Sequence, residues 1–160
     1  MNKLNWSNIP IPEGHVTLLV VGVVLHLWRP LRLFQTAWPR HVLGWPLLLI
    51  GIWLVAWAVA AVKAMDIQKP TKLITAGPYA ISRNPMYIAW TIIYLVTAIL
   101  ANTLSLIILL PVLILFTHYF VVRHEERKLE LQFGEQYRQY CARVRRYLWR
   151  ERQLVKKEKP

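Results

Sequence analysis

Two long stretches without charged side chains constrain this chain more than any other feature. Residues 42–62 form a run of 21 residues without Lys, Arg, Asp or Glu, and residues 86–122 form a second run of 37. A bilayer core about 30 Å thick needs roughly 20 helical residues, so the first run matches one span. As a single helix the second run would be about 55 Å long, so it must fold back on itself. Asn102, Thr103 and Ser105 mark the expected tip of this hairpin.

The composition also favours a membrane protein. Hydrophobic residues make up 56% of the 160 residues and charged residues only 18%, which is too few charges to cover the apolar surface of a soluble domain. We expect an all-α integral membrane protein with about four transmembrane helices, including the hairpin, and a C-terminal amphipathic helical cytoplasmic segment. The expected spans are 14–29, 42–63, 86–101 and 104–122.

The first span is short. Residues 16–28 are apolar apart from Thr17 and His26, and a start at Glu13 gives a crossing helix if the bilayer thins slightly. A cleaved signal peptide is the alternative, but its basic region would depend on Lys3 alone, and no small-x-small cleavage site follows Trp28. We therefore expect a retained first helix.

The distribution of basic residues predicts the orientation. Residues 123–160 hold twelve of the twenty Lys and Arg residues against six Glu, which predicts a cytoplasmic tail. An even number of spans places the N-terminus and the 64–85 segment on the same side. Arg29, Arg32 and Arg40 then lie in the opposite loop, against the rule. We expect a multi-pass protein of the inner, cytoplasmic membrane of a prokaryote, with its active site facing the cytoplasm.

Apolar residues recur in the tail at spacings of three and four, with an interruption near Gly134. This stripe consists of Leu129, Phe133, Tyr137, Tyr140, Val144 and Leu148. It predicts either a helix on the membrane surface or a lid over a site at the cytoplasmic face. The lysines at 156, 157 and 159 would bind anionic lipid headgroups. Because a basic tail beside a span meets lipid first, we expect no nucleic-acid partner.

Several kinds of site are excluded by residue spacing. Cys141 is the single cysteine, so a disulfide within the chain and a cysteine-based zinc site are excluded. No two histidines lie three or four residues apart, and no glycines form a Rossmann or phosphate-loop motif. We expect no metal site.

Polar groups gather in two stretches, 68–87 and 118–130, which the hairpin brings to one membrane face. In the first stretch, Asn84 suits a helix N-cap and Pro85 the first helical position, without any functional role. Arg83 is not explained in this way, and an arginine beside exposed helix-end amides suits a carboxylate or phosphate.

The second stretch begins at the end of the fourth span. Glu125 and Glu126 follow it directly, beside Arg123, His124 and Arg127. They are either a solvated helix start whose charges pair with neighbours, or carboxylates that hold an ammonium group of a ligand. His118, within the span, is interpreted as a core histidine rather than a pocket group.

At these residues the chain resembles a known family. The segment LITAGPYAISRNPMY (73–87), the hairpin, and the segment HEERKLELQFGEQYRQYCARV (124–144) are similar to isoprenylcysteine carboxyl methyltransferases and phospholipid methyltransferases. These are membrane-embedded enzymes that use S-adenosylmethionine, and the resemblance covers about residues 63–148. It implies N-terminal spans in 1–62 and a catalytic region in 63–160, made of a cofactor loop (63–87), the hairpin (86–122) and a cytoplasmic helical tail (123–160).

The resemblance also implies roles for single residues. The cofactor-binding residues would be Gln68, Lys72, Leu73, Ile74, Gly77, Tyr79, Asn84, Pro85, Met86, Tyr87 and Glu125. Glu125 would bind the ammonium group of the cofactor, Glu126 would support it, and Arg83 would complete the catalytic set. Arg123 would contact the substrate.

The acceptor implied by the resemblance is lipid-like or a small amphiphile: an isoprenylcysteine carboxylate, a phospholipid amine or a thiol. Many relatives have Arg-His-Pro where this chain has Arg83-Asn84-Pro85, and Asn occurs in the phospholipid branch. An amine acceptor would need a general base, for which His118, His124 or a glutamate is suitable. Two alternatives stay open: a sterol-reductase-like membrane oxidoreductase using a nicotinamide cofactor, and a non-enzymatic membrane scaffold. Short spans and eight tryptophans are compatible with a monomer or a dimer.

Overall fold

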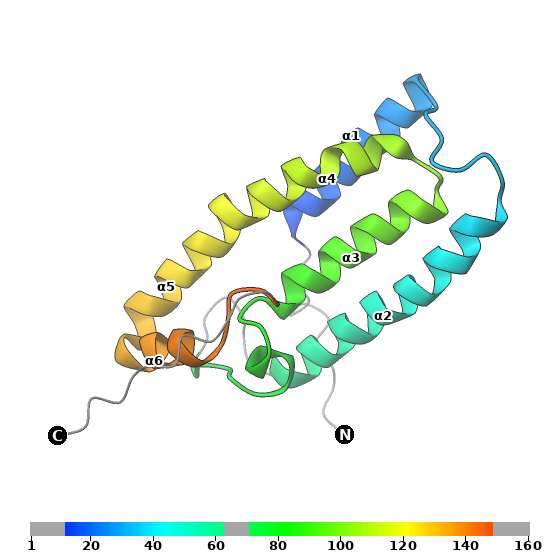
Figure 1. The fold of residues 1–160 in the computed structure, drawn as a ribbon. Helices are drawn as coiled ribbons and strands as arrows, with labels where there is room; N and C mark the ends of the chain where they lie inside the picture. The colour runs from blue at the N-terminus through cyan, green and yellow to red at the C-terminus, as the bar shows by residue number, and fades with distance from the viewer. Residues whose placement is uncertain (1–11, 63–70, 149–160) are drawn as a thin grey trace.

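A computed structural model describes residues 12–62 and 71–148 of the chain, and every regular element in these ranges is a helix. Their order along the chain can be followed in Figure 1. The elements are α1 (Glu13–Trp28), α2 (Trp38–Val62), the short 3-10 helix η2 (Gly77–Ala80), α3 (Pro85–Leu100), α4 (Leu104–Phe116), the π-helical η3 (Thr117–Val122), α5 (Arg123–Phe133) and α6 (Glu135–Arg143).

The helices of the bundle pack through small residues. α2 runs beside α3, and a side chain at Gly51 would place its Cβ 2.9 Å from Ile93. α1 runs beside α4, where a side chain at Gly22 would collide with Leu106. Small residues allow helices to approach closely, and this is the usual means of packing where lipid removes the hydrophobic drive for association. The arrangement brings the buried Tyr94, on α3, against Leu106 and Leu113 of α4.

The predicted hairpin and its tip are confirmed. α3 ends at Leu100 and α4 begins at Leu104. Asn102 lies between them with a φ of +53°, a left-handed conformation that asparagine adopts more easily than most residues. Its Oδ1 accepts hydrogen bonds from the amides of Leu33 (3.0 Å) and Phe34 (2.8 Å), and its Nδ2 donates to the Phe34 carbonyl (3.0 Å). The tip is therefore fastened to the loop that follows α1.

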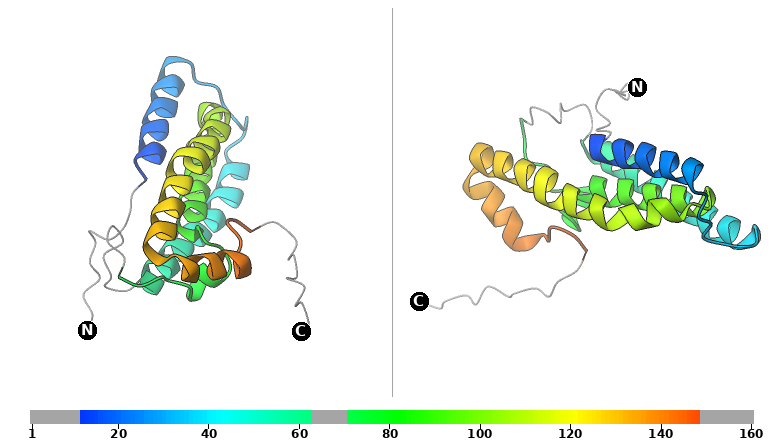
Figure 2. Two further views of the ribbon diagram at one scale, coloured as in Figure 1. Left: turned by 90° about the vertical axis from the view of Figure 1, so that its left-hand side faces the viewer. Right: turned by 90° about the horizontal axis from the view of Figure 1, so that it is seen from above.

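The fourth helix is longer than predicted. Instead of ending at residue 122, it continues from Leu104 to Phe133 through the π-helical stretch. Wider π turns change which way the following residues face, and they are frequent at functional sites. The predicted interruption at Gly134 is confirmed, because this glycine has a φ of +50° and separates α5 from α6. Figure 2 shows α6 folding back beneath the end of the bundle.

The first three predicted spans agree with the helices to within a few residues, and α2 begins four residues earlier than expected, at Trp38. Two helices, α2 and the continuous 104–133 helix, are long and apolar enough to cross a membrane. α1 and α3 are apolar but shorter. Two of these helices therefore meet the length for a span, and the four crossings stay a prediction.

Candidate active site

The chain enters α3 through a tight loop, as the sequence predicts. Gly77 has a φ of +63°, and a Cβ at this position would lie 3.2 Å from Ala61 at the end of α2. Pro78 is buried, and Tyr79 follows it in η2. Asn84 precedes the helix and Pro85 is its first residue. The glycine, without a Cβ, lets the loop lie close against α2 and so fixes the mouth of α3.

Asn84 does not use its side chain to cap α3. Its Nδ2 donates instead to the Arg146 carbonyl, at 3.2 Å. The Ser82 hydroxyl donates to the same carbonyl at 3.0 Å, and the Arg83 amide donates to the Arg145 carbonyl at 2.7 Å. Residues 145 and 146 therefore lie along the loop, and the loop and the tail form one unit.

A cluster of two arginines and one glutamate holds this unit together. Glu126 accepts two hydrogen bonds from Arg146, at 2.9 Å from Nε and 2.6 Å from Nη2, and its Oε1 lies 3.3 Å from Arg83 Nη1. The side chains of Glu126 and Arg83 are only 12% and 14% exposed. The Glu126 bonds raise the pKa of Arg146. Bidentate hydrogen bonds between arginine and carboxylate are strong and directional, so Glu126 attaches the tail to the loop.

The neighbouring glutamate faces a different partner. Glu125 Oε1 accepts a 2.6 Å hydrogen bond from the Tyr87 hydroxyl. Residue 125 as a whole is exposed, although burial of its carboxyl group raises the pKa of Glu125. Tyr87 lies in the first turn of α3, so this bond joins the two helices of the hairpin at their polar end. Adjacent residues on a helix point about 100° apart. One glutamate therefore pairs with arginines, while the other presents a carboxylate at the mouth of α3.

Tyrosines close the unit from the side of α6. Tyr137 and Tyr140 are buried, and the Tyr140 hydroxyl donates to the Tyr79 carbonyl at 2.7 Å. Burial, and then the nearby Glu125 carboxylate, raise the pKa of Tyr79 to about 12. Burial also raises the pKa of Tyr140. These hydroxyls therefore keep their protons at neutral pH. The structure places α6 over the loop, as the lid interpretation of the stripe requires.

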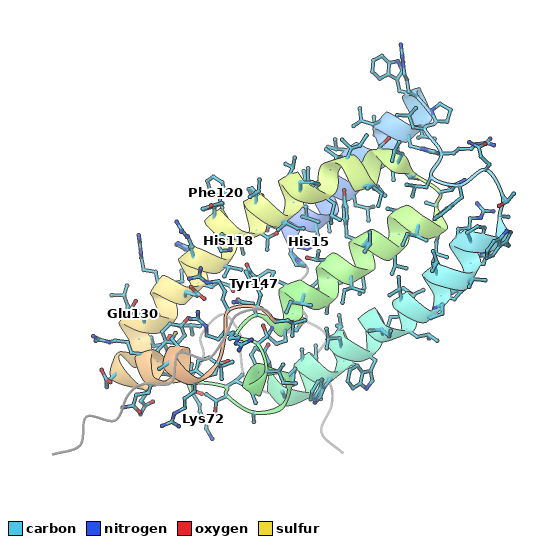
Figure 3. The ribbon with its side chains drawn as sticks, in the orientation of Figure 1. His15, Lys72, His118, Phe120, Glu130 and Tyr147 are labelled. Atoms are coloured by element: carbon cyan, nitrogen blue, oxygen red, sulfur yellow. The ribbon has the colours of Figure 1, made fainter. Side chains whose placement is uncertain are left out.

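His118 is half-buried rather than a core residue, so that interpretation was wrong. Its Nδ1 lies 3.2 Å from the Tyr147 hydroxyl, and Figure 3 shows Tyr147 reaching from the tail toward it. The π-helical stretch that contains His118 thus meets the returning tail. His118 is within reach of the candidate site through Tyr147.

The other predicted site residues are distributed unevenly. Lys72 is exposed, and Leu73 and Ile74 are half-buried. Arg123 is exposed and its guanidinium stacks over the Tyr119 ring at 4.9 Å, away from the arginine–glutamate cluster. Gln68 lies outside the described residues. The roles predicted for these residues stay predictions.

Three predicted cofactor residues are covered in this structure. Asn84 and Pro85 are buried, and Met86 packs against Ala58 and Val59 of α2. The side chain of Asn84 already donates a hydrogen bond to the Arg146 carbonyl in the tail. Among the predicted cofactor residues at the mouth of α3, Glu125 is exposed.

Sequence reasoning missed the returning segment of the tail. Ser82, Arg145 and Arg146 hold the loop against the tail, but no local pattern marks them. Tyr137 and Tyr140 belonged to the predicted stripe, and this spacing was the available signal. The lid was one of two predicted alternatives for that stripe, but the individual contacts of Tyr137 with Arg83 and of Tyr140 with Tyr79 were not predicted.

Comparison with known proteins gives one match. A family model described as phospholipid methyltransferase matches residues 39–136, from the first turn of α2 to the first turn of α6. Neither a curated protein nor a solved structure matches the chain. The match contains the loop, the hairpin, Glu125 and Glu126, whereas α1 and the returning residues 144–147 lie outside it.

Proposed function

Because this chain belongs to the phospholipid methyltransferase family, we propose that it transfers a methyl group from S-adenosylmethionine to a lipid-like or small amphiphilic acceptor. The observation that carries the proposal is the exposed Glu125 carboxylate, held by Tyr87 at the mouth of α3. The acceptor classes are those of the resemblance: an isoprenylcysteine carboxylate, a phospholipid amine or a thiol.

The side chains around Glu125 fit the charges of this cofactor. Its methionine part carries an ammonium group, for which Glu125 is a suitable partner, and a carboxylate that needs a donor. Arg83 Nε is buried without a hydrogen-bond partner among the described residues, and it is a donor of the right kind. The neutral ring of Tyr79 suits a sulfonium through cation–π attraction. S-adenosylmethionine supplies an electrophilic methyl group when it is bound.

The chain itself contributes positioning and the exclusion of water. A displacement at a methyl group gains mainly from alignment of the reacting groups and from a dry surrounding. The loop and the tail, fastened by the Arg83–Glu126–Arg146 cluster, form a cover for this purpose. Glu126 acts here as a positioning residue, through its ion pairs with Arg83 and Arg146. An amine acceptor also needs its proton removed, and His118, held by Tyr147, is the candidate base.

We place the site at the cytoplasmic membrane face. In this arrangement all four long helices cross the membrane, the hairpin tip at Asn102 lies on the far side, and the loop, α5 and α6 face the cytoplasm. The charged cofactor then arrives from water, and a lipidic acceptor from the bilayer. The inner membrane of a prokaryote is the expected location.

The family match favours a methyltransferase over the reductase alternative. The scaffold alternative explains the loop–tail unit as a structural device, but it gives no role to the exposed Glu125. A binding measurement separates all three.

The test is isothermal calorimetry of the detergent-purified full chain with S-adenosylhomocysteine. We expect saturable binding that weakens at least about tenfold in Glu125→Gln, the loss of one charge-assisted hydrogen bond. Glu130→Gln is the matched control. Glu130 lies on the same helix and is exposed, and its contact is an exposed Arg138 at 4.0 Å. Figure 3 labels Glu130 on α5.

Three other results would contradict the proposal. Binding of the reduced nicotinamide cofactor alone would favour the reductase, and binding of neither compound would favour the scaffold. Equal binding by the wild type and Glu125→Gln would remove Glu125 from the site.

A further inference from the structure

A polar cavity lies at the end of the bundle opposite the candidate active site. It has a volume of about 370 Å³, is partly open, and is formed by the end of α1, the loop before α2 and the hairpin tip. Its lining includes His26, Arg32, Thr36, Arg40 and Asn102. The family roles assigned to this chain use none of these residues.

Two nitrogen atoms of this lining are buried without partners. His26 Nδ1 and Arg40 Nε have no hydrogen-bond partner among the described residues. An arginine stays charged in proteins, so Arg40 brings a positive charge to the cavity together with Arg32. A buried donor without a partner costs about 1–3 kcal/mol, and native structures usually supply one. Arg40 Nε needs an acceptor, and beside two arginines a suitable acceptor is an anion, to which His26 Nδ1 can donate when it carries a proton.

The described residues around this cavity provide no counter-charge. Residues 14–62 and 86–122, which form the cavity and the helices around it, contain no Asp or Glu. By contrast, Arg83 and Arg146 at the other end share Glu126. Two of the three arginines that depart from the positive-inside rule, Arg32 and Arg40, line this cavity.

Hydrogen bonds hold the backbone around the cavity in place. The three hydrogen bonds of Asn102 hold residues 33 and 34, and the Leu104 amide donates to the Leu31 carbonyl at 3.0 Å. Exposed tryptophans, Trp28, Trp38 and Trp45, occupy the same end of the bundle. Tryptophans of this kind are typical of the depth of lipid headgroups.

We propose that this cavity binds a phosphate group, through Arg32, Arg40 and His26. The group belongs either to a phospholipid headgroup in the leaflet opposite the active site or to free inorganic phosphate. Arginine matches the geometry of phosphate oxygens and forms short charge-assisted hydrogen bonds with them. This site is independent of methyl transfer.

The test uses the full chain in detergent and measures affinity in two ways. Native mass spectrometry follows binding of phosphatidic acid, with diacylglycerol as the matched lipid without phosphate, and calorimetry follows binding of inorganic phosphate. We expect the Arg32→Gln/Arg40→Gln variant to bind phosphatidic acid at least about tenfold more weakly. If this variant does not fold, Arg32→Gln alone serves, since Arg32 is exposed.

Two controls separate the cavity from general attraction to basic surfaces. Arg29→Gln changes the same loop, but Arg29 stacks over Trp28 and does not line the cavity. Arg143→Gln changes the basic tail. Both should keep the wild-type affinity, and all variants should keep S-adenosylhomocysteine binding.

The outcomes identify the source of the phosphate. Binding of phosphatidic acid without inorganic phosphate supports a lipid headgroup, and binding of both supports any phosphate group. Equal losses in the cavity variant and the controls would overturn the proposal, as would equal binding of phosphatidic acid and diacylglycerol.

Discussion

The two polar ends of the bundle treat their arginines differently. At the active-site end, Arg83 and Arg146 pair with Glu126, and the three side chains bind the tail to the loop. At the opposite end, Arg32 and Arg40 line a cavity to which the surrounding sequence contributes no carboxylate. The arginines that pair with Glu126 hold two segments of the chain together. The arginines of the cavity are available to a ligand. At the active-site end, the group available to a ligand is the Glu125 carboxylate.

Each end is also fastened by an asparagine at a helix boundary. Asn84 donates from its side chain to the Arg146 carbonyl, and Asn102 makes three hydrogen bonds to residues 33 and 34. In both cases a residue that looks like a local helix signal connects segments more than 60 residues apart. Both ends therefore use an asparagine to join distant segments, and ion pairs add to this attachment at the active-site end.

The largest expected effect is the loss of the paired cluster. Glu126→Ala leaves Arg83 and Arg146 without their carboxylate in a mostly buried place, and we expect the free energy of unfolding to fall by roughly 3 kcal/mol. Denaturant titration in mild detergent measures this change. Hydrogen exchange should show faster exchange in α6, because the tail loses its attachment.

The control for this prediction is Glu130→Ala on the same helix. Glu130 meets Arg138 at 4.0 Å, and both side chains are more than half exposed. An exposed pair of this kind contributes about 0.5 kcal/mol or less. Similar losses of unfolding free energy in the two variants would show that the Glu126 cluster stabilises the fold no more than an exposed ion pair does.

At the opposite end the corresponding change is Asn102→Ala. It removes the three hydrogen bonds to the loop and puts alanine at a φ of +53°, so we expect a loss of about 2 kcal/mol. Thermal unfolding measures this effect. Asn102→Gly loses the same bonds without the backbone cost and should be about 1 kcal/mol less damaging. Equal damage by both substitutions would show that the side-chain bonds alone matter.

Features that depend on neighbouring residues are easier to predict from the sequence than features that join distant residues. The hairpin tip at Asn102, the turn at Gly77 and the helix break at Gly134 depend on backbone preferences of neighbouring residues, and all three were predicted. The bond from Glu126 to Arg146 joins residues 20 positions apart by way of a helix break, and no periodicity encodes it. The gathering of Arg32 and Arg40 depends on how the loop folds over the tip.

The same reason explains what was predicted of the candidate site. Glu125 and Tyr87 were both expected at one membrane face, since a hairpin returns its ends to the same level. Their hydrogen bond agrees with this expectation. The use of the Asn84 side chain was not predictable, because the N-cap preference already accounted for the residue.

Alkaline pH should weaken the active-site end, because Tyr79 lies in its loop. The pKa of Tyr79 is raised to about 12 from an ordinary value of 10.0. Between pH 10 and 12 the folded protein keeps a proton that the unfolded chain has lost, so stability falls as the pH rises. The slope from one such group is at most about 1.4 kcal/mol per pH unit.

Thermal midpoints measured from pH 8 to pH 12 check this prediction. Tyr79→Phe should show a shallower decline above pH 10, and the wild type should be insensitive to this group below pH 10. A decline of unchanged slope in the variant would mean that Tyr79 does not contribute.

The smallest expected effect concerns the hydrogen bond that positions the Glu125 carboxylate. Tyr87→Phe keeps the ring and removes the hydroxyl that donates to Glu125, so it frees the carboxylate to move without removing its charge. A hydrogen bond to a charged group contributes about 1.5 kcal/mol when it positions a ligand partner, which corresponds to roughly tenfold in affinity. Part of this is recovered, because the exposed Glu125 can bond to water instead. We therefore expect S-adenosylhomocysteine to bind about fivefold more weakly by calorimetry, with unfolding nearly unchanged. A stability loss as large as that of Glu126→Ala, with unchanged affinity, would place Tyr87 and Glu125 among the fastenings of the bundle and remove the difference between the two adjacent glutamates.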